Sequence, residues 1–552
     1  MNILLLAVLF VIIFSAIVPY NMDEFIHYDT ILCYLYPGND LHGTCDPFKL
    51  NFLNTGLILP LRAYFYSGSF PSLYFLPIVL LWSSPLAARC LGMVFLLLGG
   101  FIAARIFKFK TIYVLFGLVA LFPYLFQHLV DTGPIGFQVL SVFLVYLLLD
   151  RWCATLKIRI ISAITLIIFC GIWTKFSYFW FAPGFAIFFL IHIIHHRHFL
   201  SSKKNLHTLF LQSAGALFVL VILVGSLVFS TAPDNSAVRP YLDPLIHSDA
   251  LSLSEVLRGV WWHSEVVTTL LHPLEATQRV FEVVPEISIS FLYSIIVYLF
   301  APFTLLLLFC AGGKGFSRKN LILPSALTIA FFLTVIMIAR TRGAGLMHHA
   351  ILSYPFLILA SLATIRCLLI AGAQSSRVWL RLFFIAWLTA YLFVNTVLFI
   401  KVPTQRYLFH DDPEKFIVHT IINTGTIPGR TMVLVVDWGM FYYSGLFGSS
   451  QKSVLFEWGL RGEGRITYLK DLAARNGRKL VVLYTSKETA ADLPLIQRLI
   501  PLERCAATAP DAAWVMLVEP DDEIREVCAR YAAASAQQSL TQRLLLRASL
   551  TR

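Results

Sequence analysis

Two adjacent carboxylates, Asp23 and Glu24, stand directly after the first apolar run of the chain, residues 2–20. A carboxylate can take a proton from a hydroxyl group or hold a cation. At the end of a membrane helix an ionised group loses part of its hydration, which makes such an acid a candidate for function. Helix ends also carry charge that simply marks the interface, so a solvated loop start is the alternative interpretation.

Basic residues occupy two other turns between apolar segments. The first turn holds Lys175, and the second holds Arg340, Arg342, His348 and His349. Both turns fall on the outer side of the membrane, where positive charge is disfavoured. For Lys175 the alternative is a lysine that extends its charged end to the interface. An anion partner explains the whole set better, and on this face we expect a phosphate.

A third acid, Asp131, lies in the turn at residues 127–134, at the boundary of the next apolar span. Asp is a good N-terminal cap, and Pro134 follows within a few residues, as is common at the start of a helix. Asp131 can therefore be a cap, a functional acid or both.

The composition shows which kind of protein must position these residues. Of 552 residues, 58% are hydrophobic and 13% are charged, with 46 phenylalanines, which excludes a water-soluble fold of this size. The net charge of +12 reflects basic loops rather than a nucleic-acid surface. We predict a polytopic α-helical membrane protein and no nucleic-acid partner.

Apolar runs of about 17 to 25 residues, long enough to cross a bilayer, recur through the first 400 residues. Short basic connections between them mark the cytoplasmic side. We predict about 11 transmembrane helices from these two signals. The predicted spans are 3–20, 86–104, 111–128, 134–150, 159–174, 177–194, 208–230, 288–310, 321–339, 347–366 and 382–400.

The basic connections place the N-terminus in the cytoplasm, and the odd number of crossings then places the C-terminal part outside it. We read the first span as an uncleaved helix, because no basic residue precedes it and no clear small-residue cleavage site ends it. The outer loops are then 21–84 and 231–287, and all the candidate residues lie on one face. Residues 71–82 are apolar but too short to span, so we expect an interfacial or re-entrant helix there.

The outer loops contain further polar and aromatic residues without a clear site. We expect short surface helices in the apolar stretch 48–66. The His and Glu residues of the 231–287 loop have no compact ligand spacing, so we assign no metal residues, and whether a divalent cation takes part stays open. Cys33 and Cys45 are close enough in the first loop for a disulfide if the compartment is oxidising.

The composition changes after Lys401, and the prediction is a transmembrane domain over 1–401, an extracytoplasmic α/β domain over 402–527 and a basic tail over 528–552. Short apolar runs predict strands at 431–436, 479–484 and 513–518. Helices are expected between them at 412–423, 466–476 and 489–500.

The order of these features resembles the GT-C class of integral-membrane glycosyltransferases. The resemblance covers roughly residues 1–400. It rests on the Asp-Glu pair after the first helix, a surface segment leading through Pro71 into Ser84–Arg89, and the Asp after the third helix. Two later elements complete it, namely Thr174-Lys175 followed by Pro183, and the segment from His349 to Pro355. Members of the class include protein O-mannosyltransferases and the aminoarabinose transferases of lipid A. Two departures are the lack of an arginine beside Asp131 and Phe-Ser after Lys175, where such enzymes often have Gly-Pro.

The resemblance implies a polyprenyl-phosphate-linked sugar donor and a lipid, glycan or protein acceptor, handled at the outer face of the plasma (inner) membrane. Such a donor already carries a good leaving group, so one carboxylate base and a basic cluster suffice for an inverting displacement. We assign Asp23 as the base and Glu24 as its support, with Asp131 as a further catalytic acid. The phosphate contacts are assigned to Lys175, Arg340, Arg342, His348 and His349, and no cofactor is specified. The alternatives are a lipid-linked glycan transporter or flippase, and a polysaccharide polymerase or ligase.

Overall fold

The structure is a computed structural model of the whole chain. It describes 49–51, 58–60, 62–64, 67–81, 85–111, 113–115, 135–231, 253–255, 257–261, 301–302, 304–306, 318–340, 349, 351–374, 431–435, 455–458, 479–485, 503–504 and 514–518, with the single positions 309, 471, 474, 477, 526 and 529. The chain divides into two compact units, 1–19 with 48–404, and 20–47 with 405–552.

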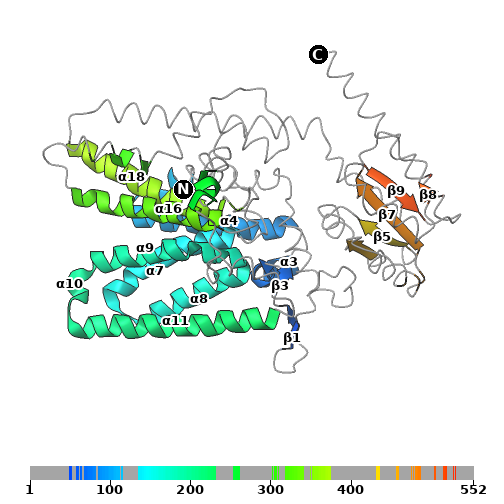
Figure 1. Ribbon diagram of the computed structural model, residues 1–552, viewed down its shortest axis with the longest axis horizontal. Helices are drawn as coiled ribbons and strands as arrows, with labels where there is room; N and C mark the ends of the chain where they lie inside the picture. Colours follow the sequence, from blue (N-terminus) through cyan, green and yellow to red (C-terminus); the bar gives the residue numbers. More distant parts are fainter. Residues whose placement is uncertain are drawn as a thin grey trace, which may run out of the picture. The chain divides into compact units, whose positions relative to one another are not determined.

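The first unit is helical, and its helices follow the apolar runs of the sequence (Figure 1). The helices are α3 (Phe70–Leu81), α4 (Pro85–Phe107), α7 (Ile135–Thr155), α8 (Ile158–Thr174), η2 (Phe176–Phe181), α9 (Ala182–His195), α10 (Arg197–Leu200), α11 (Lys203–Thr231), η3 (Arg318–Leu321), α16 (Ile322–Arg340), η4 (Ile351–Ser353) and α18 (Tyr354–Gln374). Within the described ranges, six helical segments are long and apolar enough to cross a membrane, and α8 is a shorter apolar helix.

These bounds agree with the predicted spans at 86–104, 134–150, 159–174, 177–194, 208–230, 321–339 and 347–366. The short helix expected at 71–82 is α3. The remaining predicted spans, 3–20, 111–128, 288–310 and 382–400, lie wholly or mostly outside the described residues. The protein is thus a helical membrane protein, and the full number of crossings stays a prediction.

The α7 helix lies at the centre of this unit, where it contacts α4, α8 and α9. On the other side of α9, α16 packs against both α9 and α18. The ring of Phe356 in α18 reaches Gly184 of α9, and a methyl group at Gly184 would overlap that ring. Small residues let membrane helices approach in this way, since packing rather than expulsion of water holds them together.

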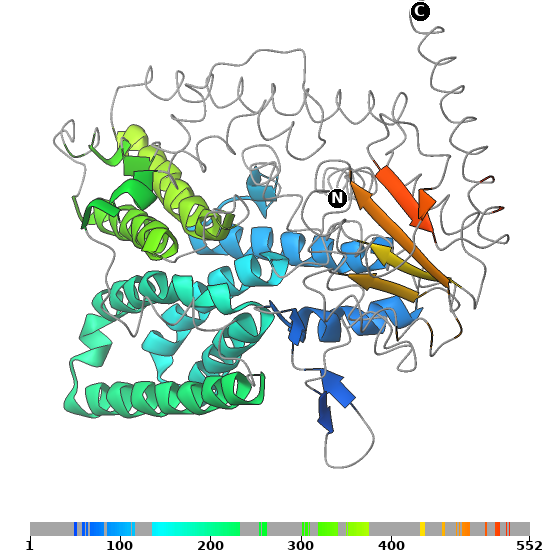
Figure 2. The same ribbon diagram turned by 45° about the vertical axis from the view of Figure 1, so that its right-hand side comes forward.

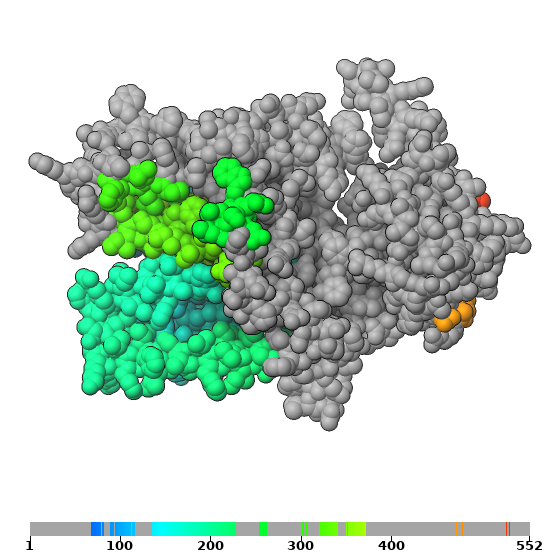
Figure 3. Space-filling model, viewed as in Figure 1, coloured from blue at the N-terminus to red at the C-terminus, as the bar shows by residue number. Residues whose placement is uncertain are grey.

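The outermost helix of this group, α11, packs on α8 and leaves most of its surface uncovered. Phe210 is 69% exposed and Phe218 is 67% exposed. Figure 3 shows α11 along the lower edge of the coloured surface. An apolar face of this extent on a helix of 29 residues is what contact with lipid requires.

The segment before α3 contradicts one expectation. In place of surface helices, the described residues of 49–68 contain two antiparallel pairs, β1 (Lys49–Asn51) with β2 (Ile58–Pro60) and β3 (Arg62–Tyr64) with β4 (Ser67–Gly68) (Figure 2). The sequence between β1 and β2 holds Asn54, Thr55 and Gly56, residue types that favour turns. A short apolar run cannot be assigned to helix or strand from its pattern alone.

The second unit contains one five-stranded sheet. Its order is β6 (Leu455–Trp458), β5 (Thr431–Val435), β7 (Lys479–Thr485), β9 (Trp514–Val518) and β8 (Glu503–Arg504). The pairs β5–β6 and β5–β7 are parallel, while β9 is antiparallel to β7 and β8. Three strands match the predicted ones within one residue at each end, but the predicted helices lie almost entirely outside the described residues. The α/β character, the domain limits and the location outside the cytoplasm stay predictions.

Candidate functional site

The site forms where α8 ends. Lys175 has extended backbone angles (φ −160°, ψ 130°), so the helix stops and η2 begins at the next residue. The turn is held by its own backbone, because the Lys175 N–H donates to the Gly171 carbonyl at 3.2 Å and the Lys175 carbonyl accepts from the Tyr178 N–H at 3.0 Å. The lysine is therefore presented by a rigid break between two helices.

The side chain of Lys175 is almost completely buried, with 1% of the residue exposed. Lysine is among the residue types least often buried, because its ammonium group must find partners that replace water. This burial argues against the alternative that Lys175 merely extends to the interface. A buried ammonium group at the end of a membrane helix is well suited to bind an anion.

Two further polar groups accompany the lysine turn. Gln138 of α7 directs its Nε2 at the Lys175 carbonyl, at 3.5 Å, and Ser177 lies two residues after the lysine. Both residues are fully buried, and the Gln138 Oε1 and Ser177 Oγ atoms have no hydrogen-bond partner within the part of the chain that is described. Unpaired buried polar atoms cost free energy, so atoms of this kind are candidates for contacts with a ligand.

A hydrogen-bonded chain fixes η2 against α7. The Ser141 Oγ donates to the Gln138 carbonyl at 2.6 Å and lies 2.7 Å from the Tyr178 hydroxyl, which then acts as the donor to Ser141. The Tyr178 ring packs over Gly171, where a methyl group would overlap it. These contacts connect the lysine turn to the helix that carries Gln138.

His349 reaches the same 3-10 helix from the far side of the sequence. Its ring lies edge-on to Trp180 of η2, with centroids 5.2 Å apart, and the residue is 4% exposed. Arg340 ends α16, a helix that contacts η2, and is partly buried. The structure thus brings His349 to η2, the element that begins next to Lys175. Arg340 ends a helix that also contacts η2.

The other predicted site residues lie outside the described residues, namely Asp23, Glu24, Asp131, Arg342 and His348. Their roles, and the assignment of Lys175, Arg340 and His349 to a phosphate, stay predictions. Cys33 and Cys45 also lie outside this part of the chain.

Gln138 and Ser177 were not among the predicted site residues, and Arg89 was named only as the end of the Ser84–Arg89 segment. Arg89, in α4, is only 1% exposed although it is charged. The sequence shows polar residues in or beside apolar spans, and such residues are candidates for function. Only the fold shows which of them are buried.

We expect the Ser141–Tyr178 contact to show an asymmetric response to mutation. Tyr178→Phe leaves Ser141 bonded to Gln138 and should cost about 0.5 to 1.5 kcal/mol of stability, whereas Ser141→Ala strands a buried hydroxyl and should cost about 1 to 3 kcal/mol. The double variant should resemble Tyr178→Phe, because the stranded hydroxyl is gone. Unfolding of the detergent-solubilised variants measures this, and strictly additive effects would contradict the contact.

Comparison with known proteins identifies the fold but no close relative. No protein-family model matches the chain, and no curated protein matches it significantly. The crystal structure of ArnT from Cupriavidus metallidurans bound to undecaprenyl phosphate aligns with a TM-score of 0.55 and 11% identity, covering 94% of this chain and 98% of that one. The apo structure of ArnT from the same organism aligns over 94% of this chain with a TM-score of 0.38 and 11% identity. The first of these alignments shows that the chain has the fold of ArnT, which is the GT-C fold that the order of its motifs predicted.

Proposed function

We propose that this protein is a membrane glycosyltransferase that moves a sugar from a polyprenyl-phosphate donor to a lipid, glycan or protein acceptor. The observation that carries the proposal is the buried Lys175 at the α8–η2 turn, together with the Gln138 Oε1 and Ser177 Oγ atoms, which have no hydrogen-bond partner among the described residues. This cluster lies in a fold shared with a protein whose crystal structure contains undecaprenyl phosphate.

Lys175 is the main contact of the donor phosphate in this proposal. Its ammonium group supplies a point charge, and the Ser177 hydroxyl can donate a hydrogen bond to a phosphate oxygen. His349 is close to η2 through Trp180, and Arg340, Arg342 and His348 complete the cradle. The Gln138 Oε1 atom accepts only, so it suits a hydroxyl of the sugar better than a phosphate.

The reaction is a single displacement at the anomeric carbon. The acceptor hydroxyl oxygen forms the new bond to that carbon while the bond from carbon to the phosphate oxygen breaks, and Asp23 takes the hydroxyl proton. The polyprenyl phosphate leaves with its negative charge stabilised by the basic cradle. No covalent nucleophile is needed, so the configuration at the anomeric carbon is inverted. Glu24 and Asp131 support the acceptor side of the site.

The site opens to the outer face of the membrane in this proposal. The basic connections around Arg151–Arg159 and Arg197–Lys204 lie at the ends of α7, α9 and α11. Lys175 lies at the other end of α8, and a predominance of positive charge marks the cytoplasmic side.

A reaction with purified protein in detergent micelles separates the proposal from its alternatives. Membrane extract that contains lipid-linked sugars is incubated with the protein, and the lipids are analysed by mass spectrometry. A transferase should release polyprenyl phosphate and add one sugar to an acceptor. A flippase would leave every mass unchanged because micelles have no two sides, and a polymerase would produce a ladder of lengthened glycans. Unchanged masses with active extract would contradict the proposal.

A further inference from the structure

A cluster of imidazole and carboxylate groups lies at the end of α7 that is remote from Lys175. Asp150 is the acid of this cluster, and it follows Gln138 by 12 residues in α7, which corresponds to about 18 Å along the helix axis. The histidines come from the end of α9. The cluster is therefore separate from the site proposed for the donor phosphate.

Two histidines hold the Asp150 carboxylate. The His196 Nε2 atom lies 2.8 Å from its Oδ1 atom, and the His192 Nδ1 atom lies 3.3 Å from the same oxygen. His192 is buried, and its ring lies against Tyr146 with centroids 4.6 Å apart. Because His192 contacts the carboxylate from the protein interior, it fixes the orientation of Asp150 at the surface.

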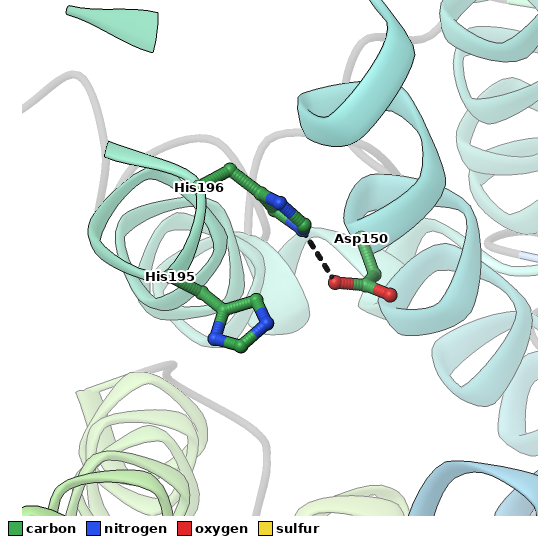
Figure 4. A group of neighbouring side chains, drawn as sticks. All are labelled: Asp150, His195 and His196. Atoms are coloured by element: carbon green, nitrogen blue, oxygen red, sulfur yellow. Dashed lines mark hydrogen bonds and ion pairs between the residues drawn. The ribbon is translucent and has the colours of Figure 1, made fainter. Parts of the chain in front are cut away.

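A third histidine faces the same space. His195 and His196 are consecutive, and consecutive residues of a continuous helix do not face each other. The helix breaks at this point, since His196 has φ −96° and ψ 17° and separates α9 from α10. As a result their rings lie with centroids 4.7 Å apart, and Figure 4 shows both rings and the Asp150 carboxylate around a common space.

We propose that Asp150, His195 and His196 bind a divalent transition-metal cation, with Zn²⁺ as the best match. One ligand atom from each of the three residues lies within 4.8 Å of the others. Bonds of about 2.0 to 2.2 Å to a common zinc ion would bring such atoms to about 3.3 Å from one another, a change that side-chain rotation can supply. Two imidazoles and one carboxylate suit transition metals, whereas Mg²⁺ and Ca²⁺ prefer oxygen ligands alone.

The surroundings allow a cation to enter. The Asp150 side chain is 43% exposed and that of His196 is 19% exposed, so water can complete the coordination. The ion would exchange the direct His196–Asp150 hydrogen bond for two bonds to metal and would join the ends of α7 and α9. His192 would keep its contact with the carboxylate as a positioning residue, an arrangement that commonly supports metal ligands.

The test is a zinc titration of the full-length protein in detergent, after chelator treatment and desalting, with competition against a chromophoric zinc chelator. We expect one site in the wild type, a loss of about tenfold or more in affinity for His195→Ala and His196→Ala, and no effect of millimolar Mg²⁺. His198→Ala is the matched control, because His198 is an exposed histidine of the same stretch that does not belong to the cluster. Equal affinity of His195→Ala and the wild type would overturn the proposal.

Thermal unfolding distinguishes metal binding from a purely structural hydrogen bond. Among the described residues, no hydrogen bond or ion pair joins His195 to Asp150, so His195→Ala should unfold like the wild type in the presence of chelator. Zinc should raise the unfolding temperature of the wild type and of His198→Ala but not that of His195→Ala. If zinc stabilises all three proteins equally, the ion binds elsewhere and the assignment is wrong.

Discussion

Replacing Asp23 with asparagine lowers the rate of sugar transfer by about 10² to 10⁴ in our proposal, while the donor lipid still binds. Asparagine keeps the shape and the hydrogen-bonding capacity of the side chain but cannot accept the proton of the acceptor hydroxyl. Asp23 is preferred over Glu24 because it stands closer to the end of the first apolar span, where a short side chain is held more rigidly.

Glu24→Gln is the matched control for this experiment, since adjacent side chains cannot easily point at the same hydroxyl. We expect it to reduce turnover less than Asp23→Asn. Turnover and binding of undecaprenyl phosphate are measured on the same preparations, so that a misfolded variant is recognised by its failure to bind. If Asp23→Asn transfers sugar at the wild-type rate, the residue is an interfacial charge and the base is another group.

Replacing Lys175 with methionine should weaken the binding of undecaprenyl phosphate by about 1.5 to 3 kcal/mol, or roughly 10- to 140-fold. Methionine fills similar space without the charge, so the change removes the phosphate contact. Binding is measured on variant protein that elutes as a folded species in detergent. Weaker binding by folded protein would point to a lost contact rather than to unfolding.

Lys157→Met provides the control. Lys157 immediately precedes α8 and Lys175 immediately follows it, so the two lysines are about 27 Å apart along one helix. Lys157 is exposed, whereas Lys175 is buried. Wild-type affinity is expected for Lys157→Met. Equal affinities for the lipid in both variants would show that the phosphate binds elsewhere.

The helices of the first unit could be predicted because runs of apolar residues long enough to span hydrocarbon are the strongest signal that a sequence carries. The turn at Lys175 could be predicted for the same reason, since it separates two such runs. The strands at residues 49–68 could not, because each contains only two or three residues and the segment has no sustained periodicity.

The structure describes three residues of the predicted site, Lys175, Arg340 and His349, and their roles stay predictions. The charge of Lys175 on the disfavoured side of the membrane pointed to it, and burial supports the choice. Gln138 and Ser177 carry no charge, and Gln138 is 37 positions from Lys175 in the sequence, so only the packing of α7 against the α8–η2 turn reveals them as a group. Asp150 and His195 could not be named as candidate ligands from the sequence, since their ligand atoms meet through folding rather than through a compact spacing.

The length of α8 has a consequence for the lipid that would bind at its end. The helix contains 17 residues and rises about 26 Å, which is shorter than the hydrocarbon layer of about 30 Å. With the exposed Lys157 held at the aqueous boundary, the opposite end of the helix stops below the level of the lipid headgroups, and the bilayer must thin there or draw a polar group inward. A lipid phosphate bound to Lys175 would place a polar group at this depth and so relieve the hydrophobic mismatch. The polyprenyl chain of that lipid would stay within the acyl layer.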